Sequence, residues 1–422
     1  MGADLSRAFG LQDVDDMVSM SKDLINIPSR TGEEGAIGDY VAERFSQLGM
    51  RVQMQEVEPG RRNVVASLKG SRPGPTLLFL AHFDTSTDPG ADLPAGFQPF
   101  AKVENDWIHG LGISNMKCAF AGFHSALKML KAADLDFAGE IIVAGVVGEI
   151  EKGPIDDWQG VRYRGGGIGA RFMVNHGVTA DFCINGEPTG LRLQVANAGY
   201  AFVRIRVAGI TQATFSRERS LDPIPKAIRL FEAIKEWEPE YQRRHPHPFM
   251  KLLVSVGGIY GGMPYKPSMT PSYCSLYLHV NTLPDQEIPG VKAELEELVA
   301  REAERDSDLK ASVDVFVASK GNEISMDHPV AQAVARAHRT VVGSDVTTPN
   351  PERFSVSSDN SPLAEFDIPG ITYGAGGINM SGQYSMYEPG VGEVVSVENL
   401  ATCSRVYLAA AADLLRESPA ES

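Results

Sequence analysis

The sequence predicts an α/β protein whose mainly parallel central sheet carries helices on both faces and is interrupted by an inserted α+β domain. Three observations lead to this prediction. Short apolar runs bounded by glycine or proline alternate with segments of helical period in the first part of the chain. Near Leu191 the pattern changes to strands that alternate apolar and polar residues. After residue 312 the first pattern returns.

Residues 1–190 are expected to form most of the central sheet. Glu33 and Glu34 lie just before a run of apolar residues with helical period, where the helix dipole favours acidic side chains. The apolar runs that follow are short, as in buried strands. The elements expected here are, in order, two helices within 13–49 separated by a turn at 27–32, strands at 64–68 and 76–81, a helix at 119–132 and a strand at 139–147.

Residues 191–312 are expected to form the inserted domain, and residues 313–422 to complete the first one. A run at 202–207 alternates apolar with basic residues, which is typical of a strand with one wet face. The further elements expected are a helix at 225–237, a strand at 276–280, a helix at 331–342 and a strand at 371–373. The length of the chain agrees with two domains of ordinary size.

Composition excludes several classes of partner. The 422 residues carry a formal net charge of −15, which argues against nucleic acid and anionic membranes because both are polyanions. The N-terminus has no apolar signal-peptide core, and no stretch approaches the ~18 apolar residues of a membrane span. The four cysteines lie far apart without a CxxC pair. These features predict a cytoplasmic protein with reduced thiols.

A histidine and an aspartate follow the strand expected at 76–81. His82 comes directly after the apolar run, and Asp84 lies two positions later. A side chain at the carboxyl end of such a strand points into the crevice where open α/β sheets bind ligands. Neutral imidazole is a common metal ligand, and a carboxylate on the same face of a strand can fix its tautomer. Taken alone, however, this pair is better explained as a buried histidine satisfied by an aspartate.

Glu187 ends another apolar run and precedes Pro188. The proline forces an extended or turned backbone that aims the carboxylate outward. By itself this glutamate is best explained as part of a surface turn. Its meaning changes when it is taken together with three other segments. The four segments are, in order, AHFD at 81–84, GLGISNMK at 110–117, GEIE at 148–151 and GEPT at 186–189.

In this order the segments resemble the two-zinc metallopeptidase family of aminoacylases, carboxypeptidase G, succinyl-diaminopimelate desuccinylase and acetylornithine deacetylase. The resemblance covers nearly the whole chain, and glycines at 374–377 fall where the family's late ligand is expected. It implies a catalytic domain built from 1–190 and 313–422, with 191–312 as a lid and dimerisation domain. It also implies a homo-oligomer, at least a dimer, that acts on a small molecule.

Three positions depart from the family's motifs. The family's metal-bridging aspartate is Asn115 here, and an amide bridges two cations poorly because it brings no charge. The family's late histidine falls at Gly382, which has no side chain. The family has two adjacent glutamates, the first a general base and the second a metal ligand. Here either Glu149 matches the base and Ile150 replaces the ligand, or Ile150 replaces the base and Glu151 matches the ligand. We prefer Glu149 as the base, because all three losses then remove the same metal site.

The resemblance then implies one divalent transition metal (Mn, Zn or Co) per subunit, held by His82, Asn115 and Glu187. Glu149 is expected to take a proton from water, with Asp84 as a further catalytic residue, and the metal is expected to lower the pKa of that water. Such a weakly charged ligand set should hold its metal loosely, so a chelating substrate could complete the coordination sphere. The alternative from another class is a relic without metal that serves as a binding or assembly protein.

The family's substrate anchors are absent as well. Thr214 stands where the family's lid histidine reaches across the dimer, and Ser268 and Asn281 stand where an asparagine and an arginine bind a substrate carboxylate. The substrate must therefore be held differently. The further candidates for substrate binding are one arginine, two residues of a segment that resembles the family's GxTDA, and two aromatic residues that could flank a flat ring: Arg353, Ser358, Asp359, Phe354 and Tyr373.

These departures favour hydrolysis of a non-peptide C–N bond in a small carboxylate-bearing substrate, with release of ammonia. The most specific expectation is the conversion of 5-nitroanthranilate to 5-nitrosalicylate. The ortho carboxylate and amine of that substrate can meet one metal, and its nitro group can absorb charge as hydroxide adds to the ring. Such an addition does not need a second metal to polarise a carbonyl. Hydrolysis of an N-acyl amino acid or a peptide is the alternative within the family.

Overall fold

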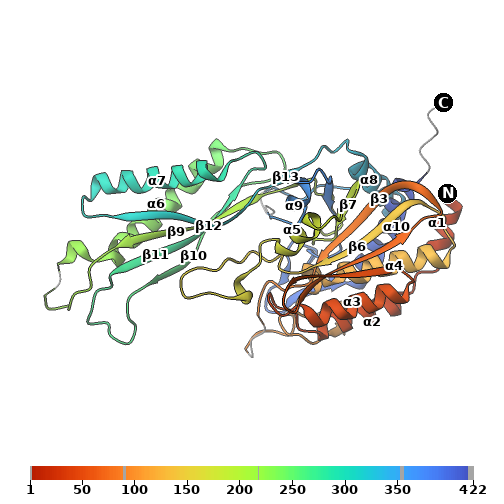
Figure 1. Cartoon of the computed structure of the whole chain (residues 1–422), viewed down its shortest axis with the longest axis horizontal. Helices are drawn as coiled ribbons and strands as arrows, with labels where there is room; N and C mark the ends of the chain where they lie inside the picture. Colours follow the sequence, from red (N-terminus) through yellow and green to blue (C-terminus); the bar gives the residue numbers. More distant parts are fainter. Residues whose placement is uncertain (1, 89–91, 217, 352–355, 417–422) are drawn as a thin grey trace. The chain divides into compact units, whose positions relative to one another are not determined.

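The computed structural model describes residues 2–88, 92–216, 218–351 and 356–416. The chain divides into two compact units. The first comprises Met1–Ala196, Glu323–Pro349 and Ser358–Ser422, and the second comprises Asn197–Asn322 and Asn350–Ser357. Each unit has its own sheet and helices (Figure 1).

A six-stranded sheet forms the centre of the first unit. Its strands are, in sheet order, β1 (Arg51–Glu58), β2 (Arg61–Lys69), β6 (Ala138–Val146), β3 (Arg72–His82), β7 (Phe182–Asn185) and β14 (Gly370–Thr372). Neighbouring strands from β6 to β14 are parallel, whereas β2 is antiparallel to both of its neighbours. The predicted mainly parallel sheet is therefore confirmed.

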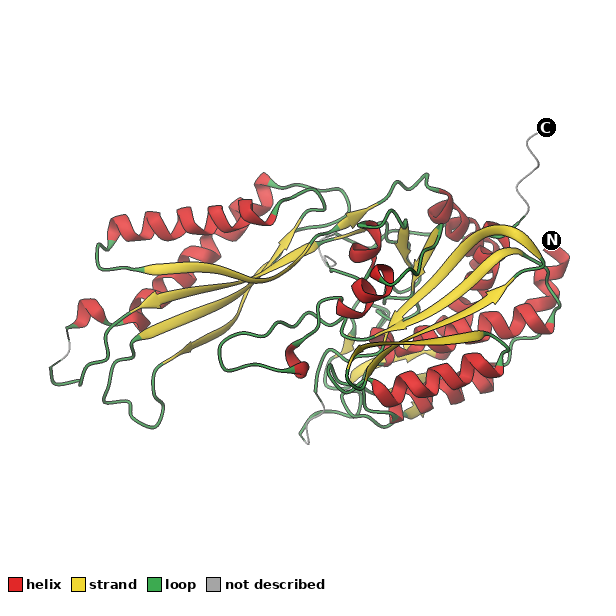
Figure 2. Ribbon diagram, in the orientation of Figure 1, coloured by secondary structure: helices red, strands yellow, loops and turns green. Residues whose placement is uncertain are grey.

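Helices cover both faces of this sheet (Figure 2), as predicted. On one face, Leu78 and Leu80 pack in one buried cluster with Met173 of α5 and Leu363 of α9. On the other face, the ring of Phe79 contacts rings of α4 and α10 at centroid distances of 4.9 and 5.6 Å. The helices of the unit are α1 (Gly2–Phe9), α2 (Val14–Asn26), α3 (Gly35–Gln47), α4 (Cys118–Ala132), α5 (Ile168–Asn175), α8 (Pro329–Val342), α9 (Asn360–Ala364) and α10 (Val397–Leu414).

Shorter elements complete the first unit. A small sheet has the order β15 (Tyr387–Glu388), β16 (Gly392–Ser396), β5 (Trp107–His109) and β4 (Lys102–Glu104). The short strands β8 (Ala196–Asn197) and β13 (Asn322–Glu323) pair with each other where the chain passes between the units. The helical turns are a π-helical turn at Ile113–Lys117 and 3-10 turns at Val161–Tyr163 and, in the second unit, at Arg219–Leu221.

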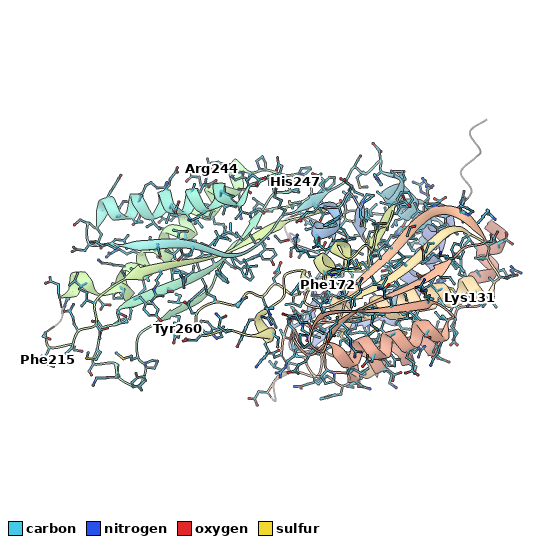
Figure 3. The ribbon with its side chains drawn as sticks, viewed as in Figure 1. Lys131, Phe172, Phe215, Arg244, His247 and Tyr260 are labelled. Carbon is cyan, nitrogen blue, oxygen red and sulfur yellow. The ribbon has the colours of Figure 1, made fainter. Side chains whose placement is uncertain are left out.

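The second unit is an antiparallel sheet with two helices. Its strands have the order β10 (Val254–Gly261), β11 (Tyr273–Thr282), β9 (Gly199–Ala208) and β12 (Ala311–Ser319), and its helices are α6 (Pro223–Arg244) and α7 (Ile288–Arg305). In β9, buried Val203 and Ile205 alternate with half-buried Arg204 and Arg206, so the predicted wet face is present. Apolar side chains such as Phe215 lie exposed at the surface of this unit (Figure 3).

The second unit begins at Asn197, after the predicted start at 191, and its first segment runs to Asn322, past the predicted end at 312. Its strand β12 runs to Ser319 because it pairs along its length with β9, so a boundary at 312 would cut through the sheet. All the helices and strands expected from the sequence are present, with ends shifted by up to seven residues. Among the helices of the described residues, none combines the length and apolar character needed to cross a membrane.

Candidate metal centre

The candidate ligands meet at one edge of the central sheet. His82 is the last residue of β3, Glu149 follows the end of β6, and Glu187 follows the end of β7. Because β3 pairs in parallel with both β6 and β7, the carboxyl ends of the three strands lie next to one another. Open parallel sheets bind their ligands at this edge. All three side chains are buried.

The imidazole of His82 lies at the centre of this group. Its Nε2 atom is 3.2 Å from Asn115 Oδ1, 3.6 Å from Glu187 Oε1 and 3.7 Å from Glu149 Oε2. Two atoms that bind one zinc ion at about 2.1 Å in tetrahedral geometry lie about 3.4 Å apart. One ligand atom each from His82, Glu149 and Glu187 also falls within 4.8 Å of the others. The spacing fits a single divalent ion.

The pKa shifts of the two glutamates in this group also indicate a site for a divalent cation. Burial raises the pKa of Glu149 well above its usual value, and the charge of Glu187 raises it further. Burial is also the largest cause of the raised pKa of Glu187, and the charges of Asp359 and Asp84 raise it further. Glu187 Oε1 has no hydrogen-bond partner among the described residues. Two buried carboxylates and an unpartnered oxygen around one imidazole are what a divalent cation would satisfy.

Asp84 joins His82 to the turn that carries Glu149. Its carboxylate accepts hydrogen bonds from the backbone N–H groups of Glu149 (3.0 Å) and Ile150 (3.2 Å) and from the Thr31 hydroxyl (2.8 Å). Asp84 Oδ1 lies 3.6 Å from His82 Nδ1, which is longer than a hydrogen bond. In this geometry Asp84 positions the Glu149 turn through two backbone hydrogen bonds, is itself held by Thr31, and faces the imidazole without bonding to it.

The other positions that depart from the expected motifs lie as follows. Ile150 is half-buried and brings no donor atom, and Glu151 is half-buried and not one of the three clustered ligands. Gly382 has a φ of +77° and no atom within 4 Å of the position of a Cβ. A histidine would find space there but would face the left-handed backbone conformation, which L side chains rarely adopt.

The expected substrate-binding residues are only partly brought together. Ser358 and Asp359 are buried in the first unit, and the pKa of Asp359 is raised to about 8 by burial and then by the charge of Asp84. Thr214 is exposed in the second unit, where its hydroxyl donates to the Ser268 carbonyl oxygen at 2.7 Å. Arg353 and Phe354 lie outside the described residues.

The expectation that Tyr373 flanks a flat ligand is wrong. Its side chain is fully buried, and its hydroxyl forms a 2.8 Å hydrogen bond with His338 Nδ1 of α8. The ring of Tyr407 from α10 also packs edge-on against it. Tyr373 is therefore a core residue, placed inward because it directly follows the buried strand β14.

Two buried residues beside the centre were not predicted from the sequence. Thr31 lies in the turn between α2 and α3 and donates to Asp84, as described above. Glu393 lies in β16 and accepts hydrogen bonds from the loop that carries Asn115. An acid between a glycine and two valines of an apolar strand, as at Glu393, is the sequence signal that would have drawn attention to it.

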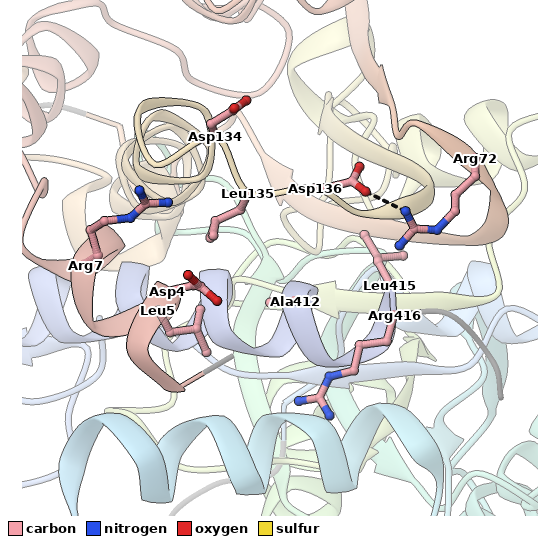
Figure 4. Close-up of a pocket in the computed structure, with 10 residues that line it drawn as sticks. All are labelled: Asp4, Leu5, Arg7, Arg72, Asp134, Leu135, Asp136, Ala412, Leu415 and Arg416. Carbon is pink, nitrogen blue, oxygen red and sulfur yellow. Dashed lines mark hydrogen bonds and ion pairs between the residues drawn. The ribbon is translucent and has the colours of Figure 1, made fainter.

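A separate hollow of about 550 Å³ lies beside the starts of β3 and β6, at the amino end of the parallel strands (Figure 4). Its charged residues include Arg72, which is paired with Asp136. Ligands of open α/β sheets bind at the opposite, carboxyl edge, so this hollow is not the candidate centre. It is lined by Asp4, Leu5, Arg7, Arg72, Asp134, Leu135, Asp136, Ala412, Leu415 and Arg416.

The family model "Peptidase family M20/M25/M40" matches residues 78–413, which include every candidate ligand and most of the chain. The chain belongs to this family. As a member of the M20/M25/M40 family it is a hydrolase with a candidate metal site. The predicted family resemblance is thereby confirmed.

Individual relatives within this family are distant. An acetylornithine deacetylase of Aliivibrio fischeri (strain MJ11) is 25% identical over 357 residues, which cover 82% of this chain and 85% of that protein. The N-formyl-4-amino-5-aminomethyl-2-methylpyrimidine deformylase of Bacillus subtilis (strain 168) is 23% identical over 426 residues, which cover 93% of each chain. Both names describe the removal of an acyl group from nitrogen.

Solved structures show the same fold. A tripeptidase from Staphylococcus aureus superposes with a TM-score of 0.73 and 18% identity, covering 97% of this chain and all of that one. The YXEP protein of Bacillus subtilis, described as a dinuclear metal-binding peptidase, superposes with a TM-score of 0.62 and 16% identity, covering 95% and 98%. At these identities the likeness concerns the fold alone.

Proposed function

We propose that this M20/M25/M40 member is a single-metal hydrolase that cleaves a C–N bond in a small, carboxylate-bearing substrate and releases ammonia. The observation that carries the proposal is the group of buried ligand atoms within 3.2–3.7 Å of His82 Nε2. Among the described residues, His82, Glu149 and Glu187 within this group are the one set of three acidic, histidine or cysteine side chains close enough to share an ion. The cofactor we propose is one divalent ion of Mn, Zn or Co per subunit.

The side chains around the centre favour one ion over two. Asn115 brings a neutral oxygen to the position where the family's bridging aspartate brings a charge, and Ile150 brings no donor atom. Two cations close together need bridging negative charge to offset their repulsion. His82, Asn115 and Glu187 are the ligands we propose, with Glu149 as the base.

In the proposed reaction the metal ligands and Glu149 have different roles. A divalent metal bound by these ligands would lower the pKa of a water molecule in the centre. Glu149 accepts the proton of the attacking water as the C–O bond forms. The same carboxyl group returns that proton to nitrogen as the C–N bond breaks. Burial of Glu149 raises its pKa, which suits a group that must hold a proton and then release it near neutral pH.

The specific substrate we propose to test first is 5-nitroanthranilate. Addition of hydroxide to its ring spreads negative charge into the nitro group, so one metal is enough to activate the water. The raised pKa of the buried Asp359 would let its carboxyl group donate a hydrogen bond to a substrate carboxylate. Hydrolysis of an N-acyl bond is the second candidate, because the deacetylase and deformylase relatives match most of the chain.

The first test measures ammonia from purified protein loaded with Mn²⁺, Zn²⁺ or Co²⁺. The panel contains 5-nitroanthranilate, anthranilate, N-acetylornithine and an N-formyl amine. Metal-dependent ammonia from the nitroaromatic supports the aminohydrolase. Release of acetate or formate instead moves the assignment to the N-acyl hydrolase. A protein that retains no metal and is silent on the whole panel would be a relic without catalysis.

Two variants test the roles within the centre. Glu149→Gln should abolish turnover while Mn²⁺ affinity stays within a fewfold of the wild type, because a base is lost and the ligands remain. A large loss of Mn²⁺ affinity in that variant would make Glu149 a ligand. His82→Ala should lose the metal, and an unchanged metal content would remove His82 from the ligand set.

We also propose that the protein is a homo-oligomer, at least a dimer, assembled through its second unit. Phe215 is 94% exposed, Tyr265 85% and Ile259 56%, and β10 is an edge strand of its sheet. Ile259 lies in β10 itself, whereas Phe215 and Tyr265 lie in loops of the same unit. Large exposed apolar side chains and an unpaired sheet edge are typical of a surface that another chain covers. Light scattering should give at least twice the 45.6 kDa chain mass, and Ile259→Lys should lower it.

A further inference from the structure

Glu393 is a fully buried carboxylate that faces the backbone of the loop carrying Asn115. It lies in β16, between Gly392 and Val394, and has no exposed surface. An ionised carboxylate is rarely buried without charged or hydrogen-bonding partners, because removing it from water is costly. Its partners therefore indicate why the chain keeps an acid at this position.

Those partners are three backbone hydrogen-bond donors of one loop. Glu393 Oε1 accepts the N–H of Gly112 at 3.0 Å. Glu393 Oε2 accepts the N–H groups of Ser114 at 3.0 Å and of Asn115 at 3.1 Å. Both carboxylate oxygens are used, and each contact has the length of a normal backbone hydrogen bond. The carboxylate thus fixes the backbone on which the Asn115 side chain is mounted.

The same loop has further supports. The Ser114 hydroxyl accepts the N–H of Gly377 at 3.0 Å. A Cβ at Gly376 would lie 2.3 Å from the Ser114 carbonyl oxygen, so the two loops are in direct backbone contact. Lys117, at the end of the same loop, is also fully buried, and its ammonium donates to the Leu24 and Ile27 carbonyl oxygens at 2.9 Å.

The loop needs these supports because Asn115 is a weak ligand. A carboxylate is drawn to a cation by its charge, whereas an amide oxygen contributes only when it is already placed at the right distance. Asn115 Oδ1 lies 3.2 Å from His82 Nε2, within the ligand group. Since the backbone N–H of Asn115 is held by Glu393, the position of the amide oxygen depends on a residue 278 positions away.

We propose that Glu393 is a positioning residue for the metal centre, which holds the Asn115 amide against His82 through the three backbone hydrogen bonds. The inference rests on the proposed single-metal function. It adds to that function an explanation of how a neutral amide can serve where a charged ligand is expected. Glu393 touches neither metal nor substrate in this role.

Glu393→Gln is the sharpest perturbation. The side-chain volume stays nearly constant, but one carboxylate oxygen becomes an NH₂ group that points its hydrogens at a backbone N–H. At least one of the three hydrogen bonds is then replaced by a repulsive contact. Glu393→Asp is a milder change, since it keeps the charge but shortens the reach by one methylene group. Tyr407→Phe serves as the control, because it removes a buried hydrogen bond to the Tyr373 carbonyl oxygen elsewhere in the same unit.

Two measurements on the full-length protein test the proposal. Hydrogen–deuterium exchange of the metal-free protein should show faster exchange over residues 110–117 in Glu393→Gln and no change there in Tyr407→Phe. Titration with Mn²⁺ alone should show affinity about 10–100-fold weaker in Glu393→Gln, an intermediate loss in Glu393→Asp, and wild-type affinity in Tyr407→Phe.

The outcomes separate the inference from the proposed function. Unchanged exchange of the loop, or unchanged Mn²⁺ affinity, in both Glu393 variants would overturn the inference. If Glu393→Gln does not fold, Glu393→Asp decides in the same way. A wild-type protein that binds no Mn²⁺, Zn²⁺ or Co²⁺ would instead overturn the single-metal function, whatever the exchange data show.

Discussion

Replacing Asp359 by asparagine tests whether buried carboxyl groups make the metal-free protein less stable as the pH rises. Asp359 is buried beside the candidate centre, and its Oδ1 atom has no hydrogen-bond partner among the described residues. Burial and then the charge of Asp84 raise its pKa from 3.8 to about 8. The folded protein therefore binds this proton more tightly than the unfolded chain does.

The sign of the effect follows from that shift. A raised folded pKa contributes stability that is fully present below the unfolded value of 3.8 and is lost as the pH rises towards about 8. Within this window each pH unit changes the free energy of unfolding by about 1.4 kcal/mol. Between pH 5 and pH 7 the wild type should therefore lose about 2.7 kcal/mol through Asp359 alone. The amide side chain in Asp359→Asn cannot ionise, so this variant should lack the loss.

The assay is urea unfolding of chelator-treated protein at several pH values from 5 to 8. The quantity to compare is the difference in unfolding free energy between Asp359→Asn and the wild type at each pH, because titrating groups that Asp359 does not influence cancel in it. Glu149 and Glu187 are the exceptions, since the charge of Asp359 raises their pKa values. We expect this difference to rise in favour of the variant by about 1.4 kcal/mol per pH unit. Two parallel stability curves would refute the reasoning and would mean that Asp359 is not held protonated by its surroundings.

Two further predictions concern buried polar contacts near the centre. Arg61 is 1% exposed and pairs with the fully buried Glu34. Arg61→Met should therefore leave an uncompensated carboxylate and lower the free energy of unfolding, measured by urea titration, by about 3–5 kcal/mol. A loss below about 1 kcal/mol would show that water reaches Glu34. Thr31→Val should lower kcat about tenfold by removing the 2.8 Å hydrogen bond to Asp84, and Thr31→Ser, which keeps the hydroxyl, should retain wild-type kcat. Equal rates in both Thr31 variants would contradict the positioning role of this bond.

Much of the fold could be predicted because buried strands have a clear pattern in the sequence. Runs such as that at 76–81 are apolar on both faces and end at glycine, proline or a polar residue. Other elements carry weaker signals. The edge strand β1 is half-exposed and mixes polar with apolar residues, and α10 packs against α4 and α8, so no polar stripe marks its period. Neither was predicted from the sequence.

The candidate ligands were predictable for a related reason. His82 ends an apolar strand, Glu149 and Glu187 each follow one, and parallel strands bring such residues to one edge. The roles of Thr31 and Glu393 arise from contacts between residues far apart in the chain, which no local pattern encodes. Tyr373 was misread because an aromatic residue after a strand can point either to a ligand or into the core, and the neighbouring helices decide.

The contact between β16 and the Asn115 loop has a consequence for how the protein is made. A ribosome adds about 5–20 residues per second, so the 278 residues from Asn115 to Glu393 take about 14–56 s to synthesise. Late in that interval His82, Glu149 and Glu187 have left the ribosome, but the carboxylate that holds the Asn115 loop does not yet exist. The nascent chain thus passes through a period in which these side chains are exposed and the proposed centre is unfinished. In the proposed centre, metal capture in the finished geometry must wait until Glu393 has been made.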